Sequence, residues 1–117
     1  MRYTWDEKKN RGNIALHGVA FEDAVRIFEG PTVEKIDDRI DYGEIRVYAI
    51  GLVNGMEITV VYTDRDNDER RIISAWRSEA HERRAYWRYV ASWARDRHKL
   101  APLARNKRCR NTPGHRV

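Results

Sequence analysis

The 117-residue sequence has a single cysteine, three prolines and no long apolar run. One cysteine cannot form an internal disulfide or assemble a zinc site, so we expect neither to organise the fold. The unbroken apolar stretches are short, as in Val60-Val61-Tyr62, where a transmembrane helix needs about 20 residues. The first residues also lack the apolar segment of a secretory signal. These absences predict a cytoplasmic protein that makes no membrane contact.

Hydrophobic and aromatic residues are sufficient for one small core. Hydrophobic residues make up 41% of the chain, with four Trp, six Tyr and two Phe, which argues against wholesale disorder. The length fits a single domain.

The net charge of +5 is unevenly distributed along the chain. Residues 1–94 carry 15 basic and 17 acidic side chains (net −2), whereas residues 95–117 carry 8 basic and 1 acidic (net +7). We therefore predict a domain over 1–94 and a flexible basic extension over 95–117. Its positive charge is suited to nucleic acid phosphates, and a solvated end with no specific partner is the equally weighted alternative.

Local signals predict a strand at residues 2–5 followed by two short helices. Asp6 is placed to cap a helix over 7–17, and Gly18 is a natural left-handed end for it. Apolar residues at helical spacing then predict a second helix that Gly30-Pro31 ends: Phe21, Ala24, Val25 and Phe28.

The middle of the chain is rich in Val, Ile, Tyr and Thr and predicts strands over 32–36, 44–53, 56–63 and 70–76. Asn54-Gly55 between two strands is typical of a hairpin with a type I′ turn. The last three strands are predicted to form an antiparallel meander, with no sign of a βαβ crossover. The expected fold class is α+β with the order β-α-α-β-β-β-β-α.

A final helix is expected after Ser78, which is a candidate N-cap. Tyr86, Val90, Trp93 and Ala94 form one stripe, typical of a helix that packs on a sheet or a partner. Its aromatic residues exceed what a small core is expected to bury, so we expect part of them to serve an interface: Tyr86, Trp87, Tyr89 and Trp93.

The usual enzyme signatures are absent, including a Gly-rich phosphate loop, a Gly-x-Ser-x-Gly elbow and His-Glu-x-x-His. The four histidines lack the spacing of a metal site, so we expect neither a metal nor a cofactor. The remaining polar set is Lys8, Lys9, His17, Glu44, Arg46, Arg65, Arg71, Arg77 and His81.

Such a set is chemically sufficient for RNA cleavage without a metal. Attack of the 2′-OH on the adjacent phosphate needs a base, an acid for the leaving 5′ oxygen, and cations for the charged phosphorane. A third of the sequence is charged, however, so a solvated or salt-bridged surface role is the better interpretation of any one of these residues alone.

Several motifs in register resemble the BrnT toxin family over roughly residues 2–87. They begin with Trp5-Asp6, Lys9, Asn13, His17-Gly18-Val19, Phe21-Glu22-Asp23-Ala24 and Phe28. They continue with Gly43-Glu44, Arg46, Val60-Val61-Tyr62-Thr63, Arg71-Ile72-Ile73-Ser74-Ala75, Arg77, Glu82-Arg83 and Tyr86.

The resemblance implies the toxin of a type II toxin–antitoxin system, with a compact fold like that of RelE ribonucleases. Family members cleave RNA and arrest growth. They are neutralised by a BrnA antitoxin that carries a ribbon-helix-helix DNA-binding region, so DNA would be contacted only through the antitoxin. A heterotetramer is expected because ribbon-helix-helix proteins dimerise. The catalytic residues implied are Lys9, His17, Glu44, Arg65, Arg71 and Arg77, with Arg46 as an RNA-binding residue.

Two positions depart from the family pattern. Leu16 stands where the family often has a basic residue, and Trp76 stands where it often has Arg. Trp76 is assigned to RNA binding because an indole can stack on a base, although packing is the more common role for a Trp at a strand end. The alternative function is therefore a homologue that has lost cleavage and acts as an antitoxin-binding or RNA-binding module.

Overall fold

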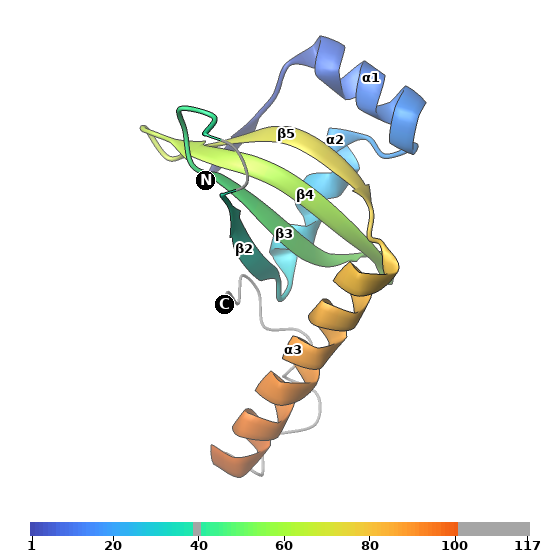
Figure 1. Cartoon of the computed structure of the whole chain (residues 1–117), viewed down its shortest axis with the longest axis vertical. Helices are drawn as coiled ribbons and strands as arrows, with labels where there is room; N and C mark the ends of the chain where they lie inside the picture. Colours follow the sequence, from blue (N-terminus) through green and yellow to red (C-terminus); the bar gives the residue numbers. More distant parts are fainter. Residues whose placement is uncertain (39–40, 101–117) are drawn as a thin grey trace.

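The computed structural model describes residues 1–38 and 41–100, with side chains described up to residue 93. The chain folds into a sheet with helices beside and below it (Figure 1). In chain order the elements are β1 (Arg2–Thr4), α1 (Glu7–His17), α2 (Phe21–Ala24), the 3-10 helix η1 (Val25–Glu29), β2 (Val33–Asp37), β3 (Arg46–Val53), β4 (Met56–Arg65), β5 (Glu69–Arg77) and α3 (Ala80–Leu100). The predicted α+β class is confirmed.

The sheet contains five strands in the order β1-β5-β4-β3-β2. Strands β2 to β5 pair antiparallel with their sequence neighbours, as a meander does. Strand β1, however, lies parallel to β5, with Tyr3 opposite Arg70. The meander predicted for the last three strands is confirmed. The parallel pairing of β1 with β5 was not predicted, because pairing between strands far apart in the chain leaves no local sequence signal.

Three turn and cap predictions are confirmed by the backbone. The Asp6 carboxylate accepts hydrogen bonds from the backbone N–H groups of Lys8 and Lys9, at 2.8 and 3.4 Å. Gly18 ends α1 with φ of 71°. Asn54 and Gly55 have φ of 50° and 79°, which are the positive values of a type I′ turn. The second helix is α-helical only to Ala24 and then tightens into η1.

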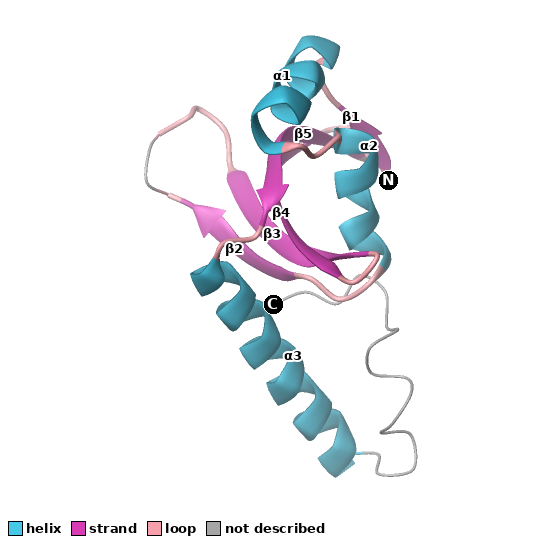
Figure 2. Ribbon diagram, turned by 90° about the vertical axis from the view of Figure 1, so that its right-hand side faces the viewer, coloured by secondary structure: helices cyan, strands magenta, loops and turns pink. Residues whose placement is uncertain are grey.

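The hydrophobic core lies between the sheet and the segment of α2 and η1, which covers one sheet face (Figure 2). Phe21, Ala24 and Ile27 from this segment are fully buried against the strands. Gly51 on β3 permits the close approach, since a Cβ there would lie 2.7 Å from the Cβ of Ile27. We call the opposite side of the sheet, which α2 and η1 leave uncovered, the open face.

Helix α3 begins beside β5 and extends away from the sheet (Figure 1). It starts at Ala80, so Glu79 precedes the first turn, and the prediction that Ser78 caps it was wrong. The Ser78 hydroxyl instead lies 2.7 Å from that of Thr59, and the Glu79 N–H donates to the Glu82 carboxylate at 2.7 Å. A glutamate that reaches back to the N–H before the helix is half of a capping box.

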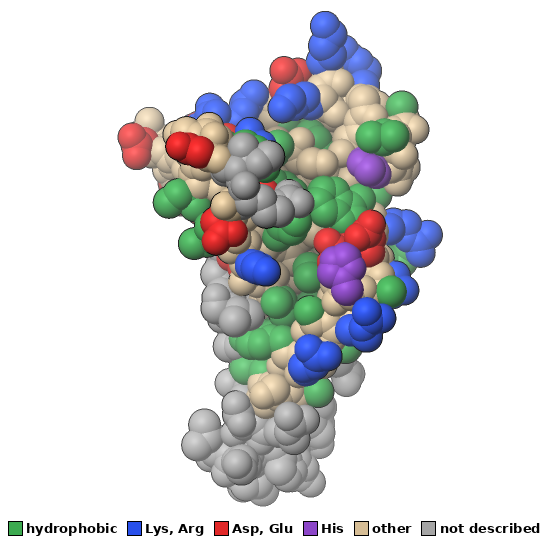
Figure 3. Space-filling view, viewed as in Figure 1, with side chains coloured by type: hydrophobic (Ala, Val, Ile, Leu, Met, Phe, Trp, Pro, Cys, Tyr) green, Lys and Arg blue, Asp and Glu red, His purple; other side chains and the backbone are tan. Residues whose placement is uncertain are grey.

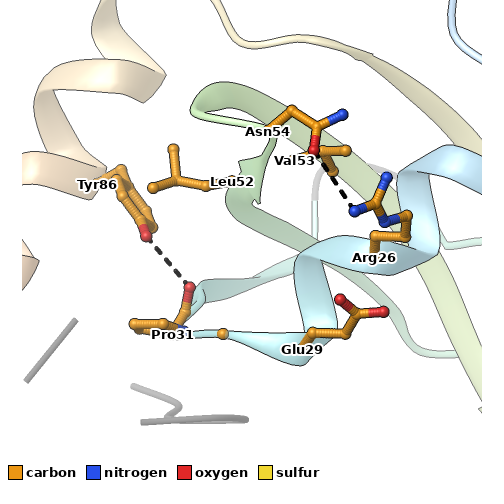
Figure 4. A pocket seen from close by; sticks show the side chains of 8 residues that line it. Arg26, Glu29, Pro31, Leu52, Val53, Asn54 and Tyr86 are labelled. Carbon is orange, nitrogen blue, oxygen red and sulfur yellow. Dashed lines mark hydrogen bonds between the residues drawn. The ribbon is translucent and has the colours of Figure 1, made fainter. Parts of the chain in front are cut away.

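Tyr86 anchors α3 to the rest of the domain. Its hydroxyl donates to the carbonyl oxygen of Pro31 at 3.3 Å, beside Leu52 in a pocket of about 250 Å³ (Figure 4). Burial raises the pKa of Tyr86 to about 12. Tyr86 is 1% exposed and Trp93 8%, whereas Trp87 is 45% exposed. The expected aromatic interface on α3 is therefore smaller than predicted, because two of its four rings are used in packing.

Helix α3 continues to Leu100, so the first residues of the predicted basic extension are helical. The remainder, over 101–117, lies outside the described residues. Within the described part of the chain, no helix has the length and apolar composition needed to cross a membrane.

Candidate functional site

A bulge in β5 decides which side chains share the open face. Val61 pairs with Ser74 but the next residue, Tyr62, pairs with Ile72, so Ile73 is an extra residue in β5. Side chains alternate along a strand, and the extra residue shifts this alternation by one position. As a result Arg71 and Trp76, five positions apart, both lie on the open face.

Arg70 and Arg71 illustrate the two faces. Arg70 is 3% exposed on the core side, where its guanidinium makes an ion pair of 2.7 Å with Asp64. It also lies 3.9 Å from the centre of the Tyr62 ring and 4.8 Å from that of Phe28. Arg71 pairs with Thr63 and is only partly buried on the open face. Arg70 therefore holds the core, and Arg71 is available for a ligand.

The structure brings Glu44, Arg46 and Arg65 together at one end of the open face. The Glu44 carboxylate lies 3.1 Å from Arg46 Nε and 3.9 Å from Arg65 Nη2. The Arg46 guanidinium also stacks 3.9 Å from the centre of the Tyr42 ring, and the Tyr42 hydroxyl donates to Asp37 at 3.1 Å. Tyr42, which the sequence analysis did not single out, fixes the orientation of Arg46.

Arg71 and Lys9 extend this group toward α1. The pKa of Asp6 is lowered by its hydrogen bonds to the N–H groups of Lys8 and Lys9 and by the charges of Arg71 and Lys9. The pKa of Glu69 is lowered by the hydroxyl of Thr4 and by several arginines, Arg65 and Arg71 among them. The charge of Arg71 therefore acts both on Asp6, at the start of α1, and on Glu69, on which Arg65 also acts. We call Lys9, Glu44, Arg46, Arg65 and Arg71 the cationic cluster.

Trp76 and His17 lie together at the other end of β5. Their ring centres are 6.1 Å apart, and the Trp76 ring meets Tyr48 edge-on at 5.8 Å. The Trp76 indole N–H donates to the Glu82 carboxylate at 3.1 Å. These two predicted site residues share an open pocket of about 500 Å³, whereas Tyr48 and Glu82 were missed because only the tertiary structure brings them to Trp76.

Arg77 is the predicted site residue that the structure sets apart from Arg71. It pairs with Ile58, a core residue, so its side chain leaves β5 on the side opposite Arg71. It is exposed and reaches the rim of the Trp76 pocket at the end of the strand.

Basic side chains gather in two places on the side of the molecule that Figure 3 shows, near α1 with the adjacent strand ends and along α3. Hydrophobic side chains lie in the middle, with acidic and His side chains among them. A surface with cations at one end and aromatic rings beside them is suited to an RNA strand, whose phosphates and bases make different contacts.

One group in the described residues places possible metal ligands within 4.8 Å of one another: Glu79, His81 and Glu82. The same Glu82 oxygen already accepts hydrogen bonds from Thr59, Trp76 and the Glu79 N–H. The side chains of Glu79 and His81 are both 69% exposed. The group is therefore accounted for by hydrogen bonding at the start of α3.

Comparison with known proteins bears on the family and the fold of the chain. The family described as the ribonuclease toxin BrnT of type II toxin–antitoxin systems matches residues 5–82. The fold is similar to the crystal structure of the Brucella abortus ribonuclease toxin BrnT, with a TM-score of 0.52 and 29% identity over 68% of this chain and 97% of that one. A search of curated proteins found no match.

The fold and the family match define a toxin of the type II toxin–antitoxin class. This chain belongs to the BrnT family of ribonuclease toxins. Membership of a type II system implies that the partner is a protein antitoxin.

Proposed function

We propose that this chain is a metal-independent endoribonuclease that cleaves RNA by attack of the 2′-OH and thereby arrests growth. The observation that carries the proposal is the cationic cluster, in which Glu44 contacts Arg46 and Arg65 while the charges of Lys9 and Arg71 act on the neighbouring carboxylate of Asp6. Fixed positive charges can stabilise a phosphorane without a metal ion, because they are aimed at the site before charge develops there.

The cluster contains groups for both proton transfers. Each Glu44 oxygen faces one arginine, and a carboxylate has further lone pairs with which to accept the 2′-OH proton. Arginine does not deprotonate in proteins, so Lys9 is the proposed proton donor to the leaving 5′ oxygen. The 2′ oxygen bonds to phosphorus as the bond to the 5′ oxygen breaks, which leaves a 2′,3′-cyclic phosphate. Arg46, Arg65 and Arg71 hold the phosphate.

Trp76 and His17 are proposed to contact a neighbouring base. Trp76 and Arg71 pair with Thr59 and Thr63, which are four residues apart on β4, a rise of about 13 Å at roughly 3.3 Å per residue. An RNA strand with one phosphate bound at the cationic cluster can therefore stack the base of a nucleotide farther along the strand on the Trp76 indole. Stacking on an aromatic ring tolerates any base, so this contact adds affinity more than sequence preference.

The test is cleavage of end-labelled RNA by the purified chain in excess EDTA. We expect fragments that end in 2′,3′-cyclic phosphate, at a rate that EDTA does not change. Loss of cleavage in EDTA, with rescue by one added metal, would overturn the metal-free mechanism.

A homologue that binds but does not cleave is the second candidate, and Trp76 is the observation that favours it. The family often has Arg at this position, and Arg77 points to the other face and cannot replace it. This candidate would be supported if the chain binds RNA, produces no cyclic phosphate ends and is not toxic when expressed.

The protein antitoxin is proposed to be BrnA-like, with a ribbon-helix-helix region, and to bridge two toxins in a heterotetramer. It would neutralise the toxin by covering the cationic cluster with acidic groups. The basic extension, most of which lies outside the described residues, is proposed to add salt-dependent attraction to RNA. Co-expression with the adjacent reading frame should yield a complex that no longer cleaves RNA.

A further inference from the structure

The carboxylate of Glu82 lies at the junction of three elements, at the N–H edge of the Trp76 ring. Glu82 belongs to the first turn of α3 and is 7% exposed. Its Oε1 atom accepts from Thr59 Oγ1 on β4 at 3.1 Å, from Trp76 Nε1 on β5 at 3.1 Å and from the Glu79 N–H at 2.7 Å.

The direction of each hydrogen bond in this network follows from the number of protons that its hydroxyl groups can donate. Thr59 has one hydroxyl proton, and that proton is used in the bond to Glu82. The Ser78 hydroxyl, 2.7 Å from Thr59, must then be the donor in their contact. Three donors, from Thr59, Trp76 and the Glu79 backbone, thus point toward one buried oxygen, with Ser78 donating to Thr59 behind them. Hydrogen bonds to a charged acceptor are the stronger kind.

This network holds the indole at its N–H edge, and two other rings contact it. Tyr48 meets the Trp76 ring edge-on with an interplanar angle of 83°, and His17 is tilted by 47° against it. The ring is only partly buried, so some of its surface remains accessible in the pocket that it shares with His17. The indole is therefore fixed in orientation before any ligand arrives.

We propose that Glu82 is a positioning residue for RNA binding, which orients the Trp76 indole for a base without touching RNA itself. This inference rests on the proposed function, because it needs RNA on the open face. It explains why a Trp at this position can act as a rigid platform: losing one restraint lets the ring rotate and adds an entropic cost to stacking.

The experiment measures binding of a short single-stranded RNA that carries 2′-O-methyl groups, so that cleavage by 2′-OH attack cannot interfere. Glu82→Ala should weaken binding about tenfold, within the range expected for one stacked base. Glu82→Gln keeps the accepting oxygen and should bind within about twofold of wild type. Trp76→Phe keeps a ring but removes the N–H, so the double variant Trp76→Phe/Glu82→Ala should bind no more weakly than Trp76→Phe.

The matched control is Glu57, whose carboxylate accepts the indole N–H of Trp87 at 2.8 Å and which is not among the residues that line this pocket. Glu57→Ala should leave RNA binding unchanged. The indole N–H resonance of Trp76, assigned by its loss in Trp76→Phe, should move in Glu82→Ala and exchange faster with solvent. If Glu82→Ala does not fold, the coupling is tested by the Trp76 indole N–H resonance in Glu82→Gln, which should shift, and by RNA binding of Trp76→Phe, which should weaken. An unshifted resonance in Glu82→Gln would overturn the coupling.

The outcomes separate the two proposals. Two outcomes would overturn the role of Glu82 and leave the proposed function standing. In the first, wild type and Glu82→Ala bind RNA equally well. In the second, the full effect of Glu82→Ala persists in the Trp76→Phe background. Wild type that binds no RNA would overturn the proposed function, and this inference with it.

Discussion

The side-chain amide of Asn13 pairs with the backbone of Ala75 as a neighbouring strand would. It donates to the Ala75 carbonyl at 2.8 Å and accepts from the Ala75 N–H at 3.2 Å. Strand β1 pairs with β5 only as far as Arg71. Beyond that point Asn13 on α1 supplies the hydrogen bonds for the backbone N–H and C=O of Ala75 at the edge of β5. Asn13 also donates to the Val19 carbonyl at 2.8 Å and is 8% exposed. One amide thus fixes α1 beside the open face.

Replacing Asn13 by alanine should destabilise the domain by about 2 to 4 kcal/mol, because buried backbone groups lose their partners. The free energy of unfolding in urea measures this. Ile14→Ala, at the next position with a 44% exposed side chain, should change it by less than about 0.5 kcal/mol. Equal stability of Asn13→Ala and wild type would show that Asn13 does not hold α1 in place.

Arg71→Ala and Lys9→Ala should each slow RNA cleavage at least tenfold, since a charge-assisted contact is worth about 1.5 to 3 kcal/mol. Folding should be unaffected, because neither side chain is in the core. Arg84→Ala, an exposed arginine on α3, is the control and should cleave at the wild-type rate. Arg77→Ala should slow cleavage less than Arg71→Ala, because Arg77 lies on the other face. Wild-type rates in both folded cluster variants would remove these residues from the site.

The Asp6 cap should make stability depend on pH in the acid range. The folded-state pKa is lowered below its ordinary value of 3.8 by the Lys8 and Lys9 N–H groups. The stabilisation is therefore fully present above that ordinary value and is lost as the pH falls through the lowered pKa. The thermal midpoint of Asp6→Ala should lie below that of wild type at neutral pH, and the gap should close in strong acid. A gap that stays constant with pH would contradict a charged cap.

Tyr86 should contribute mainly by packing and less by its hydrogen bond. Tyr86→Phe removes the bond to the Pro31 carbonyl and should cost about 0.5 to 1.5 kcal/mol of unfolding free energy. Tyr86→Ala also leaves a cavity and should cost about 3 to 5 kcal/mol. Urea denaturation of both variants measures the two values. Similar losses in the two variants would mean that the hydroxyl, and not the ring, holds α3.

Local residues were sufficient to predict the features that depend on backbone sterics. Asp6, Gly18 and the Asn54-Gly55 turn adopt the expected conformations because each is decided within a few residues. The strands over the middle of the chain were predictable for a related reason, since β-branched and aromatic residues fit a pleated, half-buried surface. The resemblance to the BrnT family was likewise readable from sequence, and the family match over residues 5–82 confirms the family.

The composition of the site was decided by the tertiary structure. Strict alternation along β5 would have placed Arg71 and Arg77 on one face and Trp76 on the other. The extra residue Ile73 shifts the alternation by one position, so that Trp76 shares a face with Arg71 and Arg77 does not. The shift follows from the pairing of β5 with β4, in which Tyr62 is opposite Ile72. In the same way Glu82 meets Trp76 only because α3 begins where β5 ends. The sequence by itself determined the family and the local elements, whereas strand register and helix placement, which depend on distant partners, determined which side chains share the open face.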